Sequence, residues 1–387
     1  MKVILDSLKP VLIGSNNDNR QWVFIGADGP PYTLLRRIIK EEPDTHDWVI
    51  LVSGNGHLGM NELKTFFRVI DKIFGEVLGK DVLNFSSPNA YSFFIDCKDT
   101  HKAWQTLEIF LHGTTMELLQ LYKATLKEET SNAQGFLQWQ SNMGKESQNF
   151  RFISQMSLNV ALAIYIQRIG DRNNDEEVSD SGRFKFMNMF YGFNHPIYCE
   201  VEYNELKQKV CYPTIVSQLR KQNSTFGNPN SDVKNNHEGG DFKLENQIKK
   251  IKSLTPKGKK DKDMWQKTIR STPAVDKLLK HGKKMLNIQD ISQSRWVQSE
   301  QEIVKWRARL RHSKYLSVKT KYVQSMSGVR MNDELSDFSN LLRSKRLLYW
   351  EMVCQGTPLQ SIRYKNISIK RESEIDAIEC YECTHTL

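Results

Sequence analysis

The sequence predicts a helix-rich α/β fold. Two stretches near the amino end each have the order strand, glycine-rich turn and helix, which is typical of an α/β layer. Most of the chain that follows has the apolar periodicity of amphipathic helices. Its 387 residues, 39% hydrophobic and 26% charged, suffice for two or three domains and exclude a chain that is disordered throughout.

The first strand is expected at residues 22–27, where β-branched and aromatic residues precede Asp28 and a Gly-Pro-Pro turn. A short helix at 33–41 should follow it. The second strand is expected at 48–52, and its continuous apolar run indicates burial on both faces. It also ends at a glycine-rich turn, after which apolar residues at helical spacing predict a helix at 58–79.

Beyond this layer the sequence becomes helical. Further helices are predicted at 101–127, 150–169, 183–191, 200–222, 241–251, 274–286, 298–319 and 333–354, and a strand at 361–369. Segments rich in Ser, Asn, Asp and Gly predict loops at 128–149, 170–182 and 223–240. We divide the chain into the first part of an α/β core at 1–127, a helical insertion with mobile loops at 128–240, a basic helical region at 241–355, and a C-terminal strand and tail at 356–387.

Positive charge is concentrated in the second half of the chain. Residues 243–321 contain 22 Lys and Arg but only 7 Asp and Glu, whereas the whole chain has a net charge of +10. Such a basic region suits a polyanionic partner such as DNA. Four aromatic residues within it have the chemistry to stack on bases: Trp265, Trp296, Trp306 and Tyr315. A solvated helical face with its aromatic residues turned inward explains the pattern equally well, so both interpretations stay open.

The sequence predicts an intracellular protein without a membrane segment. No apolar run reaches the roughly 18 residues that a spanning helix needs, and charged residues interrupt the start before a secretory core can form. The six cysteines have no framework spacing, which favours reduced thiols. Cys380 and Cys383 form a CxxC with only His385 nearby, fewer than the four ligands of structural zinc, so we assign the pair no function.

Polar residues at the predicted strand ends are candidates for chemistry. Asp28 follows the first strand, at the edge where α/β sheets place ligands, and a carboxylate beside a glycine suits a hard cation. His57 follows the second strand and suits metal ligation or proton transfer. Capping or turn formation is the competing interpretation for both. Asp99, beside His101, is explained equally as a ligand or as a helix N-cap.

A later carboxylate completes the set. Asp241 and Glu245 are one helical turn apart and therefore share a helix face, with Lys249, Lys250 and Lys252 following as a cationic stripe that suits phosphate. The competing interpretation is an ordinary ion-paired helix surface. The order of the candidates along the chain is a strand-end Asp, a strand-end His, and a late helical Glu followed by lysines.

This order resembles the catalytic core of DDE-type transposases with an RNase H-like fold. The resemblance rests on five short motifs in the same order, within residues 20–350: IGADGPPY, SGNGHLGMN, KDTHKAW, FYGFNHPIYCEVEYNEL and NHEGGDFKLENQIKKIK. They are similar to motifs of transposon-derived proteins of invertebrate genomes. The resemblance implies an RNase H-like core with a large helical insertion and a helical C-terminal region. Relatives have more sequence before the first strand, so we expect Met1 to begin a truncated or remodelled gene product.

The resemblance also implies a metal site. Asp28 would be the first metal-binding acid and Glu245 the third, holding two Mg²⁺ or Mn²⁺ ions for phosphodiester cleavage or strand transfer. Relatives have acidic residues where this chain has Asn55 and Gly59, so the second acid is open. His57 supplies the missing ligand, or Asp96 or Asp99 does, or this copy is inactive.

The basic region would then contact the DNA backbone in the nucleus, with or without homo-oligomerisation. The residues predicted to do so are Lys249, Lys250, Lys252, Lys257, Lys259, Lys260, Arg307, Arg309 and Arg311. Three functions follow from the sequence: a transposase-derived nuclease, an inactive DNA-binding or scaffold protein of the same origin, and a small-molecule enzyme that uses the strand ends as a pocket. The absence of GxGxxG and GxxxxGK[ST] motifs counts against nucleotide use in the third.

Overall fold

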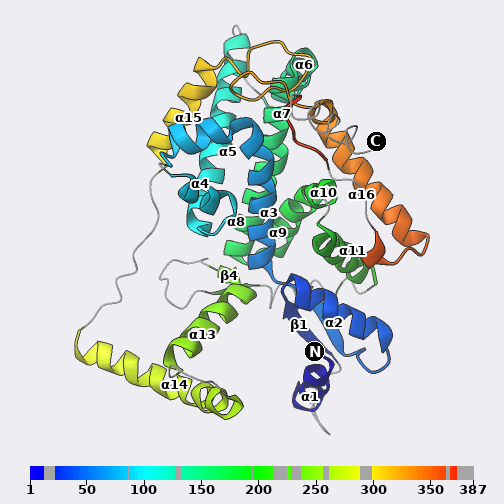
Figure 1. Cartoon of the computed structure of the whole chain (residues 1–387), viewed down its shortest axis with the longest axis vertical. Helices are drawn as coiled ribbons and strands as arrows, with labels where there is room; N and C mark the ends of the chain where they lie inside the picture. The colour runs from blue at the N-terminus through cyan, green and yellow to red at the C-terminus, as the bar shows by residue number, and fades with distance from the viewer. Residues whose placement is uncertain are drawn as a thin grey trace, which may run out of the picture.

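The computed structural model describes residues 1–12, 22–85, 87–126, 132–193, 195–211, 214, 225–227, 237–255, 261–287, 299–362 and 367–372. It is helix-rich with a small parallel sheet, which confirms the predicted helix-rich α/β class (Figure 1). Within the described residues, no helix is both long enough and apolar enough to cross a membrane.

The sheet pairs two parallel strands, β1 (Val23–Ala27) and β2 (Val49–Ser53), in a register that places Val23 beside Val49 and Ala27 beside Ser53. Helix α2 (Gly29–Glu41) connects them. It begins at Gly29, earlier than expected, because the Asp28 side chain caps it and two prolines fit its first turn, where no intrahelical N–H bond is needed.

A small apolar core lies around this sheet. Helices α1 (Lys2–Leu12), α2 and α11 (Pro196–Cys211) contribute to it. Its buried side chains include Tyr32, Trp48, Leu51 and Val201. The sheet therefore packs against helices from two parts of the chain: α1 and α2 near the amino end, and α11 about 150 residues later.

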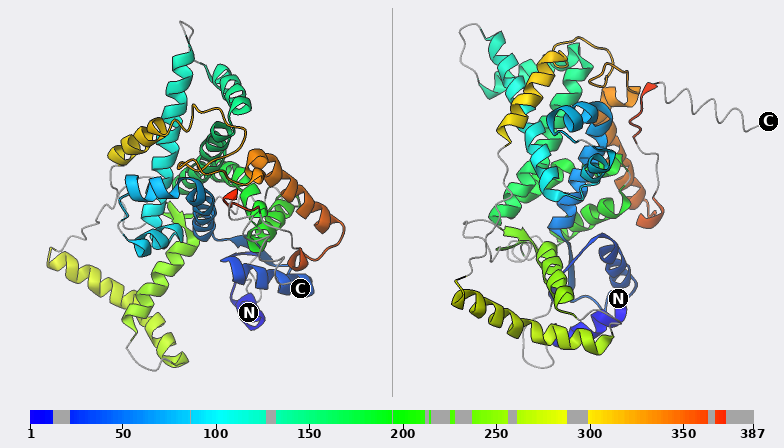
Figure 2. Two further views of the ribbon diagram at one scale, coloured as in Figure 1. Left: turned by 45° about the horizontal axis from the view of Figure 1, so that its top comes forward. Right: turned by 60° about the vertical axis from the view of Figure 1, so that its left-hand side comes forward.

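A helical body stands above the strand ends, as Figures 1 and 2 show. Helix α3 (Asn55–Ile70) leaves β2 and runs into the body, where the π-helical segment η1 (Asp71–Val82) continues it. The body's core is aromatic and includes Phe66, Phe74, Phe110 and Trp306, all fully buried. Its other elements are α4 (Pro88–Ile95), α5 (Thr100–Thr125), α6 (Ala133–Glu146), α7 (Gln148–Gln155), η2 (Met156–Ala161), α8 (Leu162–Asn173), α9 (Glu176–Phe186), α10 (Asn188–Gly192), α15 (Glu300–His312), η3 (Asp333–Asp337), α16 (Phe338–Cys354) and η4 (Leu359–Ser361).

Two predicted loops are wrong, because their polar residues cap helices. Most of the predicted loop 128–149 is α6, whose N-cap Asn132 accepts a hydrogen bond from the Gly135 amide at 2.7 Å. The predicted loop 170–182 shrinks to a short break between α8 and α9, in which Asp175 caps α9. The strand predicted at 361–369 is also wrong in its described part: Ser361 belongs to η4, and residues 367–370 form no strand.

The chain returns to the strand ends after α11. Strands β3 (Thr225–Gly227) and β4 (His237–Gly239) pair antiparallel within the predicted loop 223–240, and α13 (Gly240–Leu254) follows β4 directly. Helix α13 contacts α3 and β1. Helix α14 (Lys262–Met285) begins earlier than expected, with Asp261 as its N-cap, and extends away from the helical body (Figures 1 and 2).

Candidate functional site

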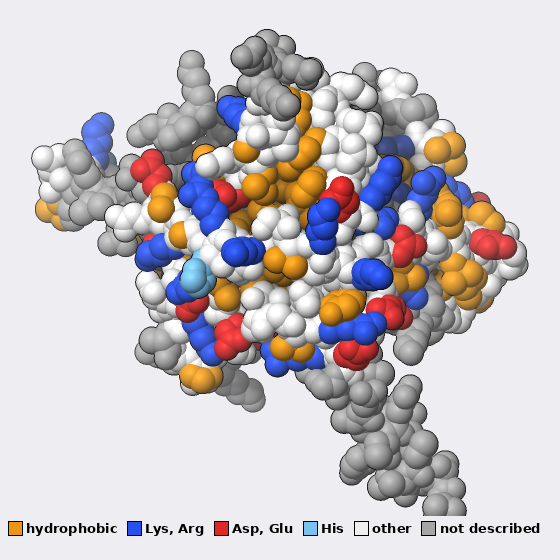
Figure 3. All heavy atoms as spheres, turned by 90° about the horizontal axis from the view of Figure 1, so that it is seen from above, with side chains coloured by type: hydrophobic (Ala, Val, Ile, Leu, Met, Phe, Trp, Pro, Cys, Tyr) orange, Lys and Arg blue, Asp and Glu red, His pale blue; other side chains and the backbone are white. Residues whose placement is uncertain are grey.

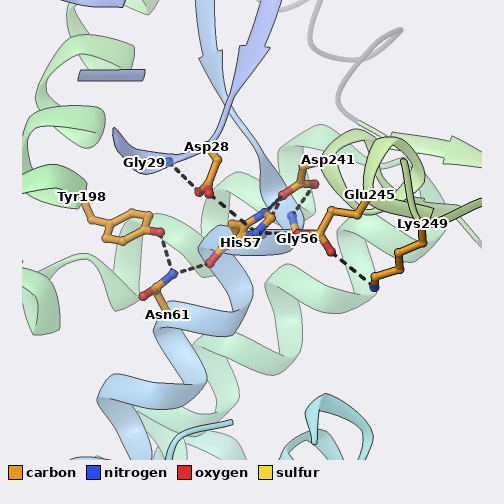
Figure 4. Close-up of polar contacts among 9 residues, drawn as sticks. All are labelled: Asp28, Gly29, Gly56, His57, Asn61, Tyr198, Asp241, Glu245 and Lys249. Carbon is orange, nitrogen blue, oxygen red and sulfur yellow. Dashed lines mark hydrogen bonds and ion pairs between the residues drawn. The ribbon is translucent and has the colours of Figure 1, made fainter. Parts of the chain in front are cut away.

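Four titratable side chains meet at the carboxyl ends of β1 and β2: Asp28, His57, Asp241 and Glu245 (Figure 4). Parallel strands end at the same edge of a sheet, so β1 and β2 bring Asp28 and His57 together. Helix α13 supplies Asp241 and Glu245 from one face, because the two residues are a helical turn apart. The predicted residues Asp28, His57 and Glu245 therefore do lie together.

Asp28 caps a helix with one carboxylate oxygen and faces the site with the other. Its Oδ1 accepts a hydrogen bond from the Gly29 amide at 2.6 Å, which caps α2. Its Oδ2 lies 3.7 Å from His57 Nε2, and the side chain is 40% exposed. One carboxylate oxygen thus remains directed at the site.

Asp241 holds the turn after β2. One carboxylate oxygen accepts the Gly56 amide at 3.0 Å, and the other accepts the His57 amide at 2.7 Å and contacts His57 Nδ1 at 2.8 Å. Burial raises the pKa of this carboxyl group, but the hydrogen bonds from His57 and Gly56 outweigh burial and lower the pKa below its ordinary value. Asp241 is therefore a charged acceptor with both oxygens occupied.

Glycine is required where Asp241 approaches the turn. A Cβ at Gly54 would lie 2.6 Å from an Asp241 carboxylate oxygen, and a Cβ at Gly239 would lie 2.6 Å from the other and from the Gly56 amide nitrogen. These separations are shorter than any van der Waals contact, so any larger side chain would displace α13 from the strand ends. This explains the glycines on both sides of the contact.

His57 lies between the carboxylates. The hydrogen bond with Asp241 raises the pKa of the ring, burial lowers it, and the charges of Asp28, Asp241 and Glu245 raise it further, with a net increase. With Nδ1 held by Asp241, Nε2 faces Glu245 Oε1 at 3.1 Å. The ring is thus oriented by one acid and presents a nitrogen to the other two.

Two further residues fix the helices around the site. Asn61, one turn after His57, donates to the His57 carbonyl oxygen at 2.8 Å and to the Tyr198 hydroxyl at 2.6 Å. Burial raises the pKa of Tyr198, and the nearby charges of Asp28 and Asp241 raise it as well, so the hydroxyl stays neutral. The Asn61–Tyr198 contact joins α3 to α11 directly beneath His57 (Figure 4).

The sequence did not identify Asp241, Asn61 or Tyr198 as site residues. The signal for Asp241 was present in its one-turn spacing from Glu245, but that spacing does not show which acid turns toward the strand ends. Tyr198 stands in one of the five motifs, but the motif does not show its role, because that role depends on how α11 packs against α3.

Asp99 and Asp96 do not join the site. Asp99 caps α5 by accepting the Lys102 amide at 3.2 Å, as its competing interpretation proposed, and Asp96 pairs with Lys98 at 3.6 Å. Asn55, at the position where the resemblance implies an acid, donates to Asp171 at 2.9 Å. The carboxylate that accompanies Asp28 and Glu245 is that of Asp241, which the resemblance did not propose.

The donor atoms at the site are of the type that a hard divalent cation prefers, but their arrangement does not suit one. Asp28 and Glu245 each offer a carboxylate oxygen, and Mg²⁺ is commonly held by one or two carboxylates together with substrate phosphate. The His57 nitrogen, however, lies between these oxygens, and both oxygens of Asp241 are occupied. In the described parts of the chain, no group of three or more His, Cys, Asp and Glu side chains is arranged to hold a metal ion.

Most of the described basic candidates are engaged within the protein. Arg307 and Arg311 bind the buried carboxylate of Glu117 at 2.6 and 2.7 Å, Arg309 pairs with Asp81 at 3.3 Å, and Lys250 pairs with Asp276. Lys249 lies 3.7 Å from Glu245, and Lys252 is exposed. Lys257, Lys259 and Lys260 lie outside the described residues.

The aromatic residues of the basic region are mostly internal. Trp306 and Tyr315 are buried, which contradicts base stacking for these two; Trp306 donates to Thr114 at 3.0 Å. Trp296 lies outside the described residues. On the face shown in Figure 3, Lys and Arg alternate with acidic and hydrophobic side chains, so this face offers no continuous cationic patch.

Comparison with models of protein families, with curated proteins and with solved structures finds no match to this chain. Arguments about its function therefore rest on the site itself.

Proposed function

We propose that this protein cleaves or transfers phosphodiester bonds of DNA, as the resemblance of its motifs to transposase cores suggests. One observation carries the proposal: the carboxylates of Asp28 and Glu245 each lie within 4 Å of His57 Nε2 at the strand ends, at 3.7 and 3.1 Å. Ligand sites of α/β proteins occur at this edge of the sheet.

The residues would divide the work as follows. Asp28 and Glu245 would hold one or two Mg²⁺ or Mn²⁺ ions through their carboxylate oxygens. When bound, such ions activate the attacking oxygen and neutralise charge at the phosphate. His57 donates the proton on Nε2 to the leaving oxygen, and Asp241 keeps the ring oriented through Nδ1. Lys249 and Lys252 contact the backbone phosphates beside the cleaved bond.

A second function is favoured by a specific observation. The imidazole of His57 stands between Asp28 and Glu245, and the described residues include no group of three or more side chains arranged to hold a metal ion. A descendant that retained the fold and lost catalysis would have this arrangement. It would bind DNA through its basic side chains and cleave nothing.

Cleavage assays separate the two functions. The purified protein is incubated with supercoiled, nicked and hairpin DNA in Mg²⁺, in Mn²⁺ and in EDTA, together with the variants Asp28→Asn and Glu245→Gln. We expect metal-dependent cleavage that falls at least about 100-fold in each variant, because each loses a charged cation ligand worth several kcal/mol. His57→Gln should lose a similar factor as the general acid is removed.

Asp99→Asn is the matched control for Asp28→Asn. Both residues are helix N-caps, and asparagine caps a helix as well as aspartate does. Asp99→Asn should therefore cleave like the wild type. Binding that weakens with salt but without cleavage would support the inactive DNA-binding protein, and the absence of both binding and cleavage would contradict both functions.

A further inference from the structure

A cavity adjoins the four-residue site on the far side of Glu245. Its volume is about 330 Å³, within the range of small-molecule pockets, and its walls come from α3, α5, α8, β4 and α13. Glu245 and Lys249 belong to its α13 wall. A molecule in the cavity would therefore lie next to the catalytic carboxylate.

One wall contains a stacked pair of planar side chains, Trp104 and Arg168. The guanidinium of Arg168 stacks over the Trp104 ring at 4.2 Å from its centroid, and Glu108 lies 3.5 Å from the same guanidinium. Burial lowers the pKa of Arg168 to about 10, which still leaves it charged at neutral pH. Indole rings and guanidinium planes are the side-chain surfaces on which nucleobases stack.

Cationic side chains suited to phosphate line the same cavity. Arg172 extends from the last turn of α8; among the described residues it forms no ion pair within 4.0 Å, and its charge acts on Glu108 from farther away. Lys249 contributes a second cation, 3.7 Å from Glu245. The carboxylate of Asp171, also in the wall, accepts hydrogen bonds from Asn55 and Ser179 through Oδ1.

A glycine on α3 keeps the cavity open. Gly59 lines it, and a Cβ at this position would meet only the edge of Trp104, at 3.6 Å. An alanine therefore fits without displacement, whereas a longer side chain would project into the space. This position allows the cavity to be filled without altering any charged group.

We propose that the cavity binds one nucleotide, with its base against the Trp104–Arg168 pair and its phosphate at Arg172 and Lys249. The inference rests on the proposed function, because Glu245 belongs to both places and the bound nucleotide is the one beside the cleaved phosphodiester. It adds to the proposed function a binding pocket for one unstacked base of the DNA.

Calorimetric titration with deoxyadenosine 5′-monophosphate tests the assignment, with inorganic phosphate and deoxyadenosine as the partial ligands. The monophosphate should bind at least about tenfold more tightly than phosphate or deoxyadenosine. It alone contacts both the Trp104–Arg168 pair, through its base, and the cations of the cavity, through its phosphate. Gly59→Leu and Arg172→Gln should each weaken it by at least about tenfold, and Gly59→Ala should leave it within about twofold. Arg172→Gln alters a partly exposed side chain and keeps the test valid if Gly59→Leu fails to fold.

A single-stranded pentanucleotide distinguishes the source of the nucleotide. Tighter binding of the pentanucleotide than of the monophosphate, lost when the central base is removed, assigns the cavity to a DNA strand; tighter binding of the monophosphate assigns it to a free nucleotide. Monophosphate affinity that is absent, or unchanged in both Gly59→Leu and Arg172→Gln, overturns the inference.

The two proposals fail separately. If the wild type cleaves DNA but neither cavity variant affects nucleotide binding, the nucleotide cavity is wrong and the proposed function stands. If the monophosphate binds and both cavity variants lose it, while no metal supports cleavage, the cavity stands and the proposed catalysis is wrong.

Discussion

Asp241 shows how one residue can be essential to a site without being a ligand in it. Its two oxygens accept two backbone N–H groups and contact the His57 ring, so its charge is used to hold the turn after β2 and to orient the imidazole. Glu245, one turn later, accepts no backbone N–H among the described residues and contacts only the side chains of His57 and Lys249 there. Two acids on one helix face thus have different tasks because the turn lies nearer to one of them.

Asp171 is a nearby buried carboxylate whose pKa is raised, unlike that of Asp241, and the effect of its burial on the free energy of unfolding can be measured. Burial raises its pKa to about 6 from 3.8, and hydrogen bonds from Ser179 and Asn55 only partly oppose burial. Between these pH values the folded protein binds more protons than the unfolded chain. Stability therefore falls as the pH rises through about 6 and the buried group ionises.

We expect Asp171→Asn to be the more stable form above pH 6, by up to about 3 kcal/mol, with the difference vanishing near pH 4. Asparagine keeps the single oxygen that accepts both hydrogen bonds, from Asn55 and Ser179. Urea unfolding of both proteins at pH 4, 6 and 7.5 measures the difference. A difference that is the same at all three pH values would show that Asp171 does not titrate in this range.

Two glycines within helices illustrate how packing decides the effect of the same substitution. In an isolated helix, alanine in place of glycine stabilises by about 1 kcal/mol. Gly59 of α3 has room for a Cβ, whereas a Cβ at Gly113 of α5 would lie 2.6 Å from the ring of the buried Trp306. That close approach lets α15 pack directly on α5.

We expect Gly59→Ala to stabilise the protein by about 0.5–1 kcal/mol and Gly113→Ala to destabilise it by about 1–3 kcal/mol. The second change forces Trp306 outward and strains its hydrogen bond to Thr114. Thermal unfolding of the two variants beside the wild type gives the sign directly. Stabilisation by both substitutions would mean that α15 can retreat from α5 without cost.

The sequence predicted the strand ends well because their signals are local. β-branched runs followed by Asp28 and by the glycines near His57 mark where β1 and β2 stop, and the parallel pairing then brings the two residues together. The contact with Glu245 was inferred only through the order of motifs. Nothing local shows that α13 docks at this edge, because the turn that Asp241 binds, at Gly56 and His57, is 185 and 184 residues earlier in the chain.

The sequence predicted the helical regions less well at their boundaries. Asn132 and Asp175 lie in the predicted loops 128–149 and 170–182 but are N-caps, since the same short polar side chains occur in loops and at helix starts. Base stacking by Trp306, one of the two interpretations of the basic region, is wrong because Trp306 is buried in the aromatic core of the body. The local sequence pattern does not show which helices pack together to form that core.

The distribution of charge over the protein gives a prediction about DNA affinity. The chain has a net charge of +10, yet several of its cations are paired internally, notably Arg307 and Arg311 with Glu117. Only cations that neutralise phosphates release counterions and so contribute to the dependence of affinity on salt.

We expect Lys249→Gln and Lys252→Gln each to reduce the slope of log affinity against log salt concentration by about 1. Arg311→Gln should leave this slope nearly unchanged and lower the free energy of unfolding instead, because Glu117 loses part of its compensation. Fluorescence anisotropy with labelled DNA at several salt concentrations provides the slopes. The opposite assignment, a reduced slope for Arg311→Gln alone, would place the DNA on α15.

Asp241 and the turn that it binds are far apart in the sequence, and this distance determines when the site can form during synthesis. His57 is joined to Asp241 across 184 residues of chain. At a synthesis rate of roughly 5–20 residues per second, the ribosome adds Asp241 on the order of 10–40 s after His57. During that interval the growing chain has Asp28 and His57 but neither carboxylate of α13. The four-residue site is therefore absent from a nascent protein, and it appears only when most of the chain has been made.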